Sequence, residues 1–336
     1  MMKTPNSGTI EGSVRFYAVF DGRSGPPLAD LALALLEQQK ITWPGLAEGY
    51  EALGEVRLRE IYGDGWGVKI QFNPGRIVSS GAKVDPETIR RRPCFLCPDH
   101  LPPEQQAILY RDDYLVLCNP MPIFPGHLTI AHRRHLPQSL PENMLTLLKL
   151  ADDFGPRMTL FYNGPRAGAS APDHLHFQAA PAGLMPIEKE ILNPRKRAGA
   201  RWRDGVEIFR TMGLARGILV IEGTEEGSVA AAVGELIDML GRQATSDGEP
   251  LLNIFCTRTR AGWRLILFPR LKLRPAAYFL EGEKRLLVSP GAVDMAGILI
   301  TSMEKDFHAL TPDLVCGIFR EVALDDAAVE ALLAAI

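Results

Sequence analysis

The sequence has little cysteine and no long apolar run. Its five cysteines are an odd number in a chain of 336 residues, which does not suit a disulfide framework and fits a reducing compartment. No apolar run is long enough to span a membrane, and the first residues, MMKTPNSGTIEGSV, lack the apolar core of a signal peptide. We therefore expect a soluble, cytoplasmic protein that does not act at a membrane.

An excess of basic residues is also absent. The 37 Lys and Arg are offset by 40 Asp and Glu, which leaves a formal net charge of -3. This balance argues against a broad nucleic-acid-binding surface and still allows a local basic pocket. The sequence contains no clean internal repeat, no heptads and no low-complexity tract. Its length favours one large or two medium domains, and its hydrophobic content of 46% is enough for a substantial core.

Alternating and apolar segments predict an α+β protein in two units, residues 1–185 and 186–336. In the first unit the turn GDGW joins EVRLREIY to GVKIQF, as in a β-hairpin. The spacing of Ser139 and Glu142 resembles a capping box and predicts a helix running to about Asp153. In the second unit LLNIFCTRT and WRLILFPR read as another hairpin. The Pro-, Gly- and Arg-rich residues 181–203 suit an interdomain connection or an exposed loop.

A metal site is suggested by cysteines and histidines that are far apart in the chain. Cys94 and Cys97 form a C-x-x-C pair in RPCFLCPDH, which alone could be a redox pair, a metal half-site or two core cysteines. Two thiolates with two imidazoles would complete a closed tetrahedral zinc site, which is structural because no position is left for water. The predicted ligands are Cys94, Cys97, His135 and His174. His132 is the alternative to His135, and His127 is expected to form local hydrogen bonds.

Three polar side chains recur at every second position in GASAPDHLHFQAA. On an extended strand His174, His176 and Gln178 would share one face, and the apolar residues between them would face the other way. Metal at His174 would hold His176 rigidly and free of metal. A neutral imidazole whose second nitrogen donates to a fixed acceptor is a good nucleophile toward phosphorus. A bare H-x-H can also be a metal half-site without any catalysis.

Several residues could hold the phosphate in such a site. The Gln178 amide and the Ser170 hydroxyl can bind its oxygens without titrating. Arg76, Lys83 and Arg166 are candidates to neutralise its charge, although each could be an ordinary surface residue.

These motifs together resemble a known family. FYNGPRAGASAPDHLHFQ resembles the active-site segment of the histidine-triad (HIT-like) superfamily, in the branch with glutamine in place of the third histidine. That branch includes galactose-1-phosphate uridylyltransferases, diadenosine tetraphosphate phosphorylases (ATP adenylyltransferases) and GDP-hexose phosphorylases, and HLHFQ is most similar to the last. GHLTIAHRRH is similar to the superfamily's strand that ends in a histidine, here His135, and CFLC resembles the uridylyltransferase zinc knuckle. The resemblance covers residues 70–182 and extends more faintly to the C-terminus.

The resemblance implies a fold and roles for single residues. The fold would be a HIT-like antiparallel sheet with flanking helices, followed by the second α+β unit. By position, His176 matches the nucleophile that forms a covalent nucleotidyl intermediate. Gln178 and Ser170 match phosphate-contacting residues, and Asn163 with Gly164 matches an Asn-Gly that supports the nucleophile's loop. Two departures stand out: one extra residue separates Ser170 from His176, and aspartate stands at position 173, where several relatives have proline.

The sequence therefore suggests a nucleotidyltransferase or phosphorylase. Its substrate would be a nucleoside diphosphate sugar or a dinucleoside polyphosphate, and the acceptor phosphate or a sugar phosphate. Relatives often pair, so a homodimer is conceivable. One alternative is a HIT-type nucleotide hydrolase, and another is a zinc-stabilised nucleotide-binding protein without turnover. The base, the leaving group and the role of the C-terminal unit are left open by the sequence.

Overall fold

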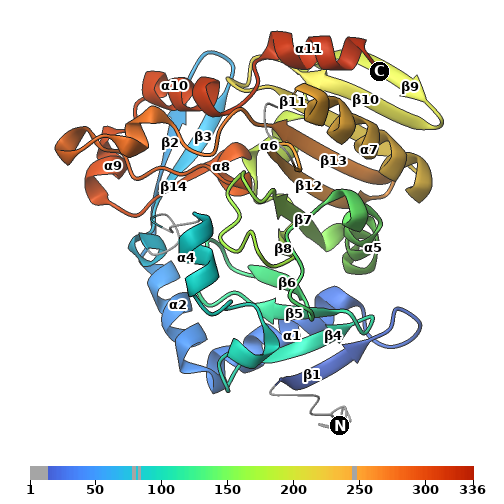
Figure 1. Ribbon diagram of the computed structural model, residues 1–336, viewed down its shortest axis with the longest axis vertical. Helices are drawn as coiled ribbons and strands as arrows, with labels where there is room; N and C mark the ends of the chain where they lie inside the picture. Colours follow the sequence, from blue (N-terminus) through green and yellow to red (C-terminus); the bar gives the residue numbers. More distant parts are fainter. Residues whose placement is uncertain (1–13, 78–80, 82–84, 244–247) are drawn as a thin grey trace.

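A computed structural model describes residues 14–77, 81, 85–243 and 248–336. Within these residues eleven strands form one long sheet, which runs from the N-terminal strand to β9 near the C-terminal helix (Figure 1). In spatial order the strands are β1 (Arg15–Phe20), β4 (Gln106–Tyr110), β5 (Tyr114–Cys118), β6 (Leu128–His132), β8 (His176–Pro181), β7 (Met158–Asn163), β12 (Leu252–Thr259), β13 (Gly262–Pro269), β11 (Ile218–Gly223), β10 (Val206–Thr211) and β9 (Arg197–Arg203). Neighbours are antiparallel except for the parallel pair of β1 and β4.

A smaller sheet and the helices cover the two faces of the long sheet. The smaller sheet has the order β14 (Ile298–Thr301), β3 (Gly67–Phe72) and β2 (Arg57–Tyr62), and β2 and β3 form the hairpin that the GDGW turn predicts. The α-helices are α1 (Leu28–Thr42), α2 (Pro44–Gly54), α4 (Pro86–Arg91), α5 (Met144–Phe154), α6 (Pro186–Glu190), α7 (Glu226–Gln243), α8 (Ala292–Met295), α9 (Glu304–Ala309), α10 (Pro312–Val322) and α11 (Asp326–Ala334). The predicted α+β class is confirmed.

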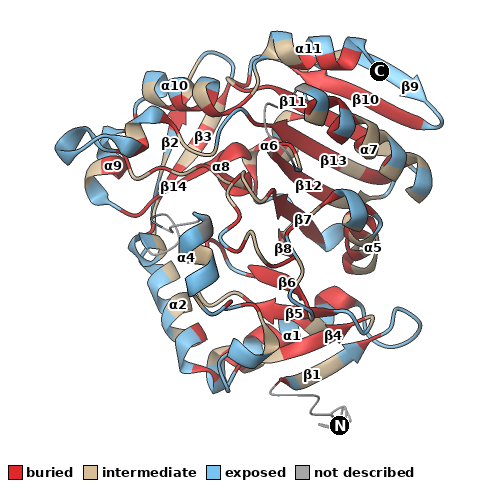
Figure 2. Ribbon diagram, in the orientation of Figure 1, coloured by how far each residue is buried: buried red, intermediate tan, exposed pale blue. Residues whose placement is uncertain are grey.

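Both faces of the long sheet bury apolar side chains, one face in a single cluster and the other in two. On one face the strands bury side chains against α1, α5, α7 and α11, so the strands and the inner sides of these helices are buried (Figure 2). The opposite face carries two separate clusters. One packs the segment around Cys94 onto β4 and β5, and the other packs β2, β3, β14 and α10 onto β12 and β13. The middle strands of the sheet lie between these two clusters, and a cavity lies over them.

Two expectations about local structure are wrong. Ser139 does not cap a helix: α5 begins only at Met144, after a 3₁₀ turn at Pro141–Asn143. Glu249 from a distant segment accepts the backbone N–H of Leu140, so a tertiary contact holds the chain just before the 3₁₀ turn. Part of the expected connection over residues 181–203 forms β9. Its charged, exposed side chains discourage further pairing at this sheet edge.

The long sheet repeats one arrangement of strands and a helix. β5, β6, α5, β7 and β8 follow each other in the chain and assemble in the order β5-β6-β8-β7. Likewise β10, β11, α7, β12 and β13 assemble in the order β10-β11-β13-β12. The two sets meet where β7 pairs antiparallel with β12, so the sheet is continuous from one half of the chain to the other. The repeat lies in the topology, although the sequence shows none.

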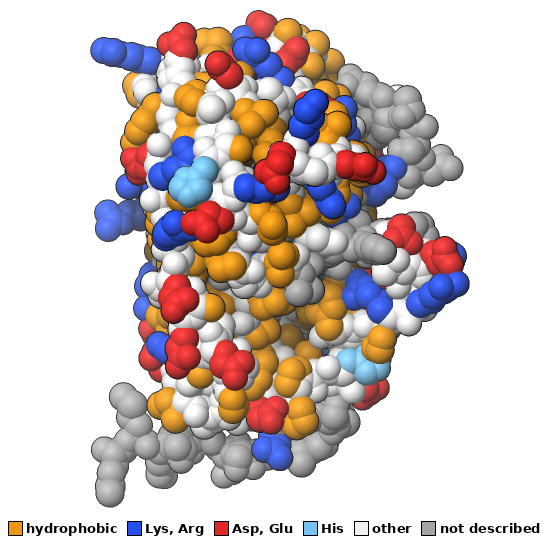
Figure 3. Space-filling model, turned by 90° about the vertical axis from the view of Figure 1, so that its left-hand side faces the viewer, with side chains coloured by type: hydrophobic (Ala, Val, Ile, Leu, Met, Phe, Trp, Pro, Cys, Tyr) orange, Lys and Arg blue, Asp and Glu red, His pale blue; other side chains and the backbone are white. Residues whose placement is uncertain are grey.

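On the face drawn in Figure 3, Lys and Arg side chains lie among Asp and Glu side chains, and the face is hollowed at mid-height. In the part of the chain that the structure describes, no helix combines the length and apolar character that crossing a bilayer requires.

Candidate functional site

A cavity of about 630 Å³ lies over the middle of the long sheet. Its floor is formed by adjacent strands β5, β6, β8 and β7, which contribute Leu117, Thr129, His176, Gln178, Phe161 and Asn163. One wall comes from the segment around Cys94, and the opposite wall comes from residues 273–300 of the C-terminal half. The cavity is therefore the gap between the two apolar clusters that cover this face of the sheet.

His176 lies on the cavity floor as a neutral imidazole. Its Nδ1 is 2.7 Å from the backbone carbonyl of His174, which can only accept, so Nδ1 carries the proton. Burial lowers the pKa of His176 to about 4, which keeps the ring neutral near pH 7. Among the described residues no hydrogen bond engages Nε2, so its lone pair is available to the cavity. His176 is thus a neutral imidazole with a free nitrogen at the cavity, the state that a nucleophile requires.

The amide of Gln178 is fixed with its NH2 group toward the cavity. The backbone N–H of Ile123 donates to Nδ1 of His127, so the proton of His127 is on Nε2. That Nε2 donates to Oε1 of Gln178 over 2.8 Å. Burial, aided by the charge of Arg76, lowers the pKa of His127 to about 3 and keeps this ring neutral. His127 thus forms the local hydrogen bonds expected of it, and these leave Gln178 as a donor.

Asn163 supplies a second amide donor by the same logic. Its Oδ1 accepts from the backbone N–H of Ala292 and from Nδ2 of Asn253, over 2.7 and 2.9 Å, so its Nδ2 is the group left for the cavity. Gly164 follows it where the chain passes close to β12: a Cβ there would lie 2.8 Å from the carbonyl oxygen of Leu252. The Asn-Gly pair therefore sets the course of the loop that leads to Ser170, at the cavity rim.

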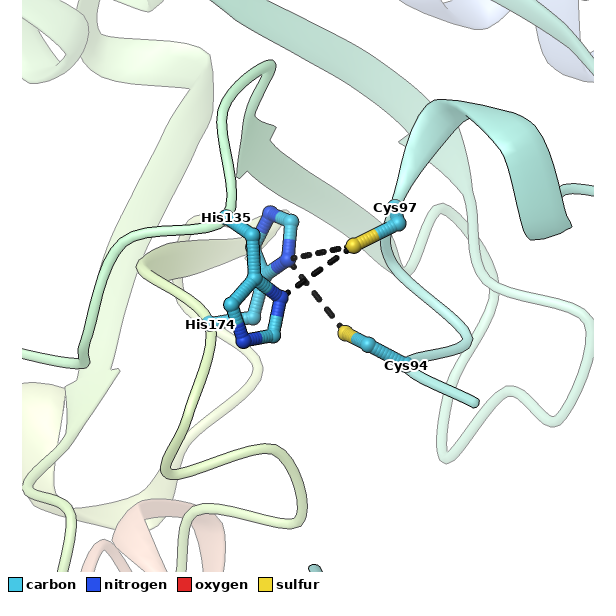
Figure 4. A group of neighbouring side chains, drawn as sticks. All are labelled: Cys94, Cys97, His135 and His174. Atoms are coloured by element: carbon cyan, nitrogen blue, oxygen red, sulfur yellow. Dashed lines mark hydrogen bonds between the residues drawn. The ribbon is translucent and has the colours of Figure 1, made fainter. Parts of the chain in front are cut away.

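The four predicted metal ligands lie together. Their ligand atoms are all within 4.8 Å of one another, with Cys94 and Cys97 on one side and the two histidine rings on the other (Figure 4). The sulfur–Nδ1 distances are 3.3 Å from Cys94 to His174 and 3.2 Å from Cys97 to His135. A tetrahedral zinc ion with bonds of about 2.0–2.3 Å separates its ligands by about 3.5 Å, so the donor set fits such an ion.

The surroundings of the rings support metal binding. Nε2 of His174 donates to the backbone carbonyl of His132 over 2.7 Å, which leaves Nδ1 as a lone pair aimed at the sulfurs. His132 itself lies outside the group, because its Nδ1 accepts from the backbone of Arg134 and its ring packs edge-on against Tyr114. The structure thus selects His135 over His132. A metal ion held here would join the Cys94 segment to the start of β8.

Comparison with known proteins agrees with this geometry. Residues 35–181 match the family model described as a domain of unknown function, DUF4922, and residues 189–336 match the GDPGP1-like C-terminal domain. The structure of yeast Ap4A phosphorylase Apa2 in complex with Ap4A aligns over 87% of this chain and 98% of its own, with a TM-score of 0.56 at 14% identity. The complex of Apa2 with AMP aligns with a TM-score of 0.57 at 15% identity, over 87% and 97%. No curated protein matches the sequence.

The chain has the HIT-like α+β fold that its motifs predict. Its HIT-like sheet includes the two strands that carry the motifs, β6 and β8, side by side. The two matched regions together span most of the chain and lie on either side of the expected boundary at residues 185 and 186.

The cations around the cavity differ in part from those expected. Arg76 lines the cavity and donates to the carbonyl of Met121 over 2.8 Å. Arg166 is not among the lining residues and donates to the carbonyl of Glu249 instead. Lys83 lies outside the described residues. Arg92 and Arg274, which sequence reasoning did not select, reach the cavity from opposite walls.

Gln138 is the other residue that the sequence did not reveal. It lies three residues after His135 and is buried. Its Oε1 accepts the backbone N–H of His176 over 2.8 Å, and its Nε2 donates to the carbonyls of His176 and Asn163, each over 3.0 Å. One amide therefore bridges β7 and β8 where the two strands separate. A polar residue three positions after the end of the GHLTIAHRRH motif was the available signal.

Proposed function

We propose that this protein is a nucleotidyltransferase that acts through a covalent nucleotidyl-histidine intermediate. The observation that carries the proposal is the grouping around His176: a neutral ring with Nδ1 tied down, and two amide NH2 groups aimed at the same cavity. Neutral donors fixed in place stabilise charge on phosphate oxygens without having to reorganise during the reaction. The relation of the fold to Ap4A phosphorylase Apa2 is consistent with this chemistry.

The reaction would consist of two displacements at one phosphorus. Nε2 of His176 attacks the α-phosphorus, an N–P bond forms, and the bond to the bridging oxygen breaks, so that a phosphorylated product leaves with the electron pair. The positive charge that develops on the ring is shared with Nδ1–H, which donates to the His174 carbonyl. An oxygen of an incoming phosphate then attacks the phosphorus, and the N–P electrons return to Nε2. Both steps use the same oriented site.

The two walls of the cavity favour an asymmetric substrate. Apolar side chains line the wall near the cysteines, namely Phe95, Leu96 and Leu101, which suits a nucleobase. The other wall carries Arg274, Ser289 and Asp294, which suits a phosphate and hydroxyl groups. We therefore favour a nucleoside diphosphate sugar over a dinucleoside polyphosphate, with phosphate or a sugar phosphate as the acceptor. A second nucleobase would find no aromatic side chain among the described residues of the C-terminal wall.

We further propose that the metal is zinc and that its role is structural. Four protein ligands leave no position for water or substrate. When bound, zinc would fix the Cys94 segment against His174 and hold the strand that carries His176. No step of the reaction passes through it.

The decisive experiment uses mass spectrometry of the intact protein with UDP-glucose, GDP-glucose, ADP-glucose and diadenosine tetraphosphate. The wild type should gain the mass of one nucleoside monophosphate, and His176→Ala should gain none while retaining zinc. His308→Ala, at an exposed histidine on α9, is the matched control and should form the adduct. Product formed without an added acceptor would favour the hydrolase, and reversible binding without adduct or product would favour the binding protein. An adduct on His176→Ala would contradict the assignment.

A further inference from the structure

One carboxylate stands between the metal group and the cavity. Asp173 directly precedes the ligand His174, and its side chain is only 18% exposed. Its Oδ1 is 3.1 Å from Nη2 of Arg92, which lines the cavity. Its Oδ2 is 3.7 Å from Nε2 of His135, which belongs to the metal group. The two oxygens therefore face two different functional side chains.

The contact with His135 suits metal binding. Nδ1 of His135 faces the sulfur of Cys97, so Nε2 carries the ring proton, and the nearest Asp173 oxygen lies 3.7 Å from it, just beyond hydrogen-bond distance. A carboxylate at the far nitrogen of a metal-bound imidazole fixes its tautomer and makes the ligand more basic. For His174 a backbone carbonyl does this. For the ring of His135, whose side chain is 47% exposed, Asp173 is the anionic group that the structure supplies.

The contact with Arg92 suits substrate binding. The same Nη2 also donates to the carbonyl of Ser170 over 3.1 Å, and the guanidinium lies 5.0 Å from the ring centroid of Phe95. Arg92 is thus held across the cavity mouth, between the cysteine segment and the loop before β8. A guanidinium held in this way can bind an anionic oxygen without first losing its side-chain freedom.

We propose that Asp173 is a positioning residue that couples the metal site to the substrate cavity. One oxygen orients His135 toward the metal, and the other holds Arg92 where it binds a phosphate of the substrate. The Arg92 contact rests on the proposed function, because it assumes a phosphorylated substrate. The His135 contact does not.

The test compares three variants in the zinc-loaded, full-length protein. Asp173→Asn should lose zinc affinity about 10- to 100-fold, measured by competition with a chromophoric chelator. With zinc saturating, it should also raise KM for the preferred nucleoside diphosphate sugar more than it lowers kcat. Arg92→Gln should raise KM similarly and leave zinc affinity unchanged. Asp313→Asn removes an exposed charge on α10, outside both the metal group and the cavity lining, and should alter neither quantity.

The combined variant and a binding measurement complete the test. The double variant, Arg92→Gln with Asp173→Asn, should have the same KM as Arg92→Gln alone. Both changes remove the same interaction, that of Arg92 with a substrate phosphate. The proposed coupling would be overturned if the effects of the two substitutions on KM multiplied in the double variant. It would also be overturned if Asp173→Asn kept the zinc affinity of the wild type. Calorimetry with UDP, GDP and ADP measures the Arg92 contribution without turnover. If the wild type binds a nucleotide and does not react, the proposed function fails. The zinc and nucleotide affinities of the variants still decide whether Asp173 couples the two sites. If it binds none, the Arg92 contact is overturned as well.

Discussion

The orientation of the Gln178 amide can be tested by exchanging one of its atoms. In Gln178→Glu the side chain keeps its shape, and one carboxylate oxygen can still accept from Nε2 of His127. The NH2 group that faces the cavity becomes a second negative oxygen. Because the backbone N–H of Ile123 fixes the tautomer of His127, the oxygen of Gln178 cannot be the atom that faces the substrate. The variant therefore places an acceptor where the phosphate needs a donor.

The expected loss follows from two contributions. Removing one fixed donor to a developing oxyanion costs a factor of about 10²–10³ in kcat, which Gln178→Leu should show by itself. A carboxylate about 4 Å from a phosphate oxygen adds a repulsion of about 4 kcal/mol at an effective dielectric constant of about 20, or up to another ~10³. Gln178→Glu should therefore be the more damaging of the two variants, although it is the closer in shape.

Single-turnover formation of the nucleotidyl adduct is the appropriate assay, because it isolates the first displacement from product release. Thermal unfolding of both variants shows whether the fold is retained. The reasoning is refuted if Gln178→Glu reacts within tenfold of the wild type, or if Gln178→Leu is the slower variant. Either result would mean that the amide presents its oxygen to the substrate.

Three further predictions concern the support of the site. His127→Phe retains a ring between Phe124 and Phe161 but leaves the Ile123 N–H without its acceptor. It should therefore cost about 1–3 kcal/mol in urea unfolding and slow adduct formation less than Gln178→Leu. Cys94→Ser should lose zinc in elemental analysis and melt at a lower temperature, because metal binding contributes to folding free energy; an unchanged zinc content would refute the ligand assignment. Burial raises the pKa of Glu249 to about 7, so its stabilising contribution is complete below its ordinary pKa of about 4.5 and is lost as the pH rises through about 7. The free energy of unfolding of Glu249→Gln, measured in urea, should therefore rise relative to that of the wild type by up to about 3 kcal/mol between pH 5 and pH 8. A difference between the two proteins that does not change with pH would contradict the raised pKa of Glu249.

Two features make parts of the site predictable from the sequence: the geometry of a single strand, and a combination of residue types that has few other uses. Alternation along one strand places His176 and Gln178 on the same face whatever the tertiary structure is. The four Cys and His residues predicted as ligands are far apart in the chain, and the structure places them close enough together to hold a metal ion. Both inferences depend on few residues. The hairpin at residues 57–72 was predictable for a local reason as well, because a glycine-containing turn joins two alternating segments.

The parts that the sequence did not reveal depend on tertiary packing. Arg92, Arg166 and Arg274 look alike in sequence, and only the path of the chain decides that Arg92 and Arg274 reach the cavity and Arg166 does not. Gln138 serves the site through its contacts with backbone groups of β7 and β8, which leave no trace in composition or period. The start of α5 was mispredicted because a 3₁₀ turn precedes the helix and the chain before this turn is held by a distant glutamate.

The repeated topology explains why the second half of the sheet contributes a wall and not a second site. β13 occupies in its half the place that β8 occupies in the first, between the strand before the helix and the strand after it. On the face that carries His176 and Gln178 in β8, β13 presents Ile266 and Phe268, which are buried under the C-terminal elements. An apolar face of this kind cannot attack phosphorus, but it anchors the segment that carries Arg274 and Asp294 over the first half. One copy of the arrangement thus supplies the groups proposed to react, and the other closes the cavity around them.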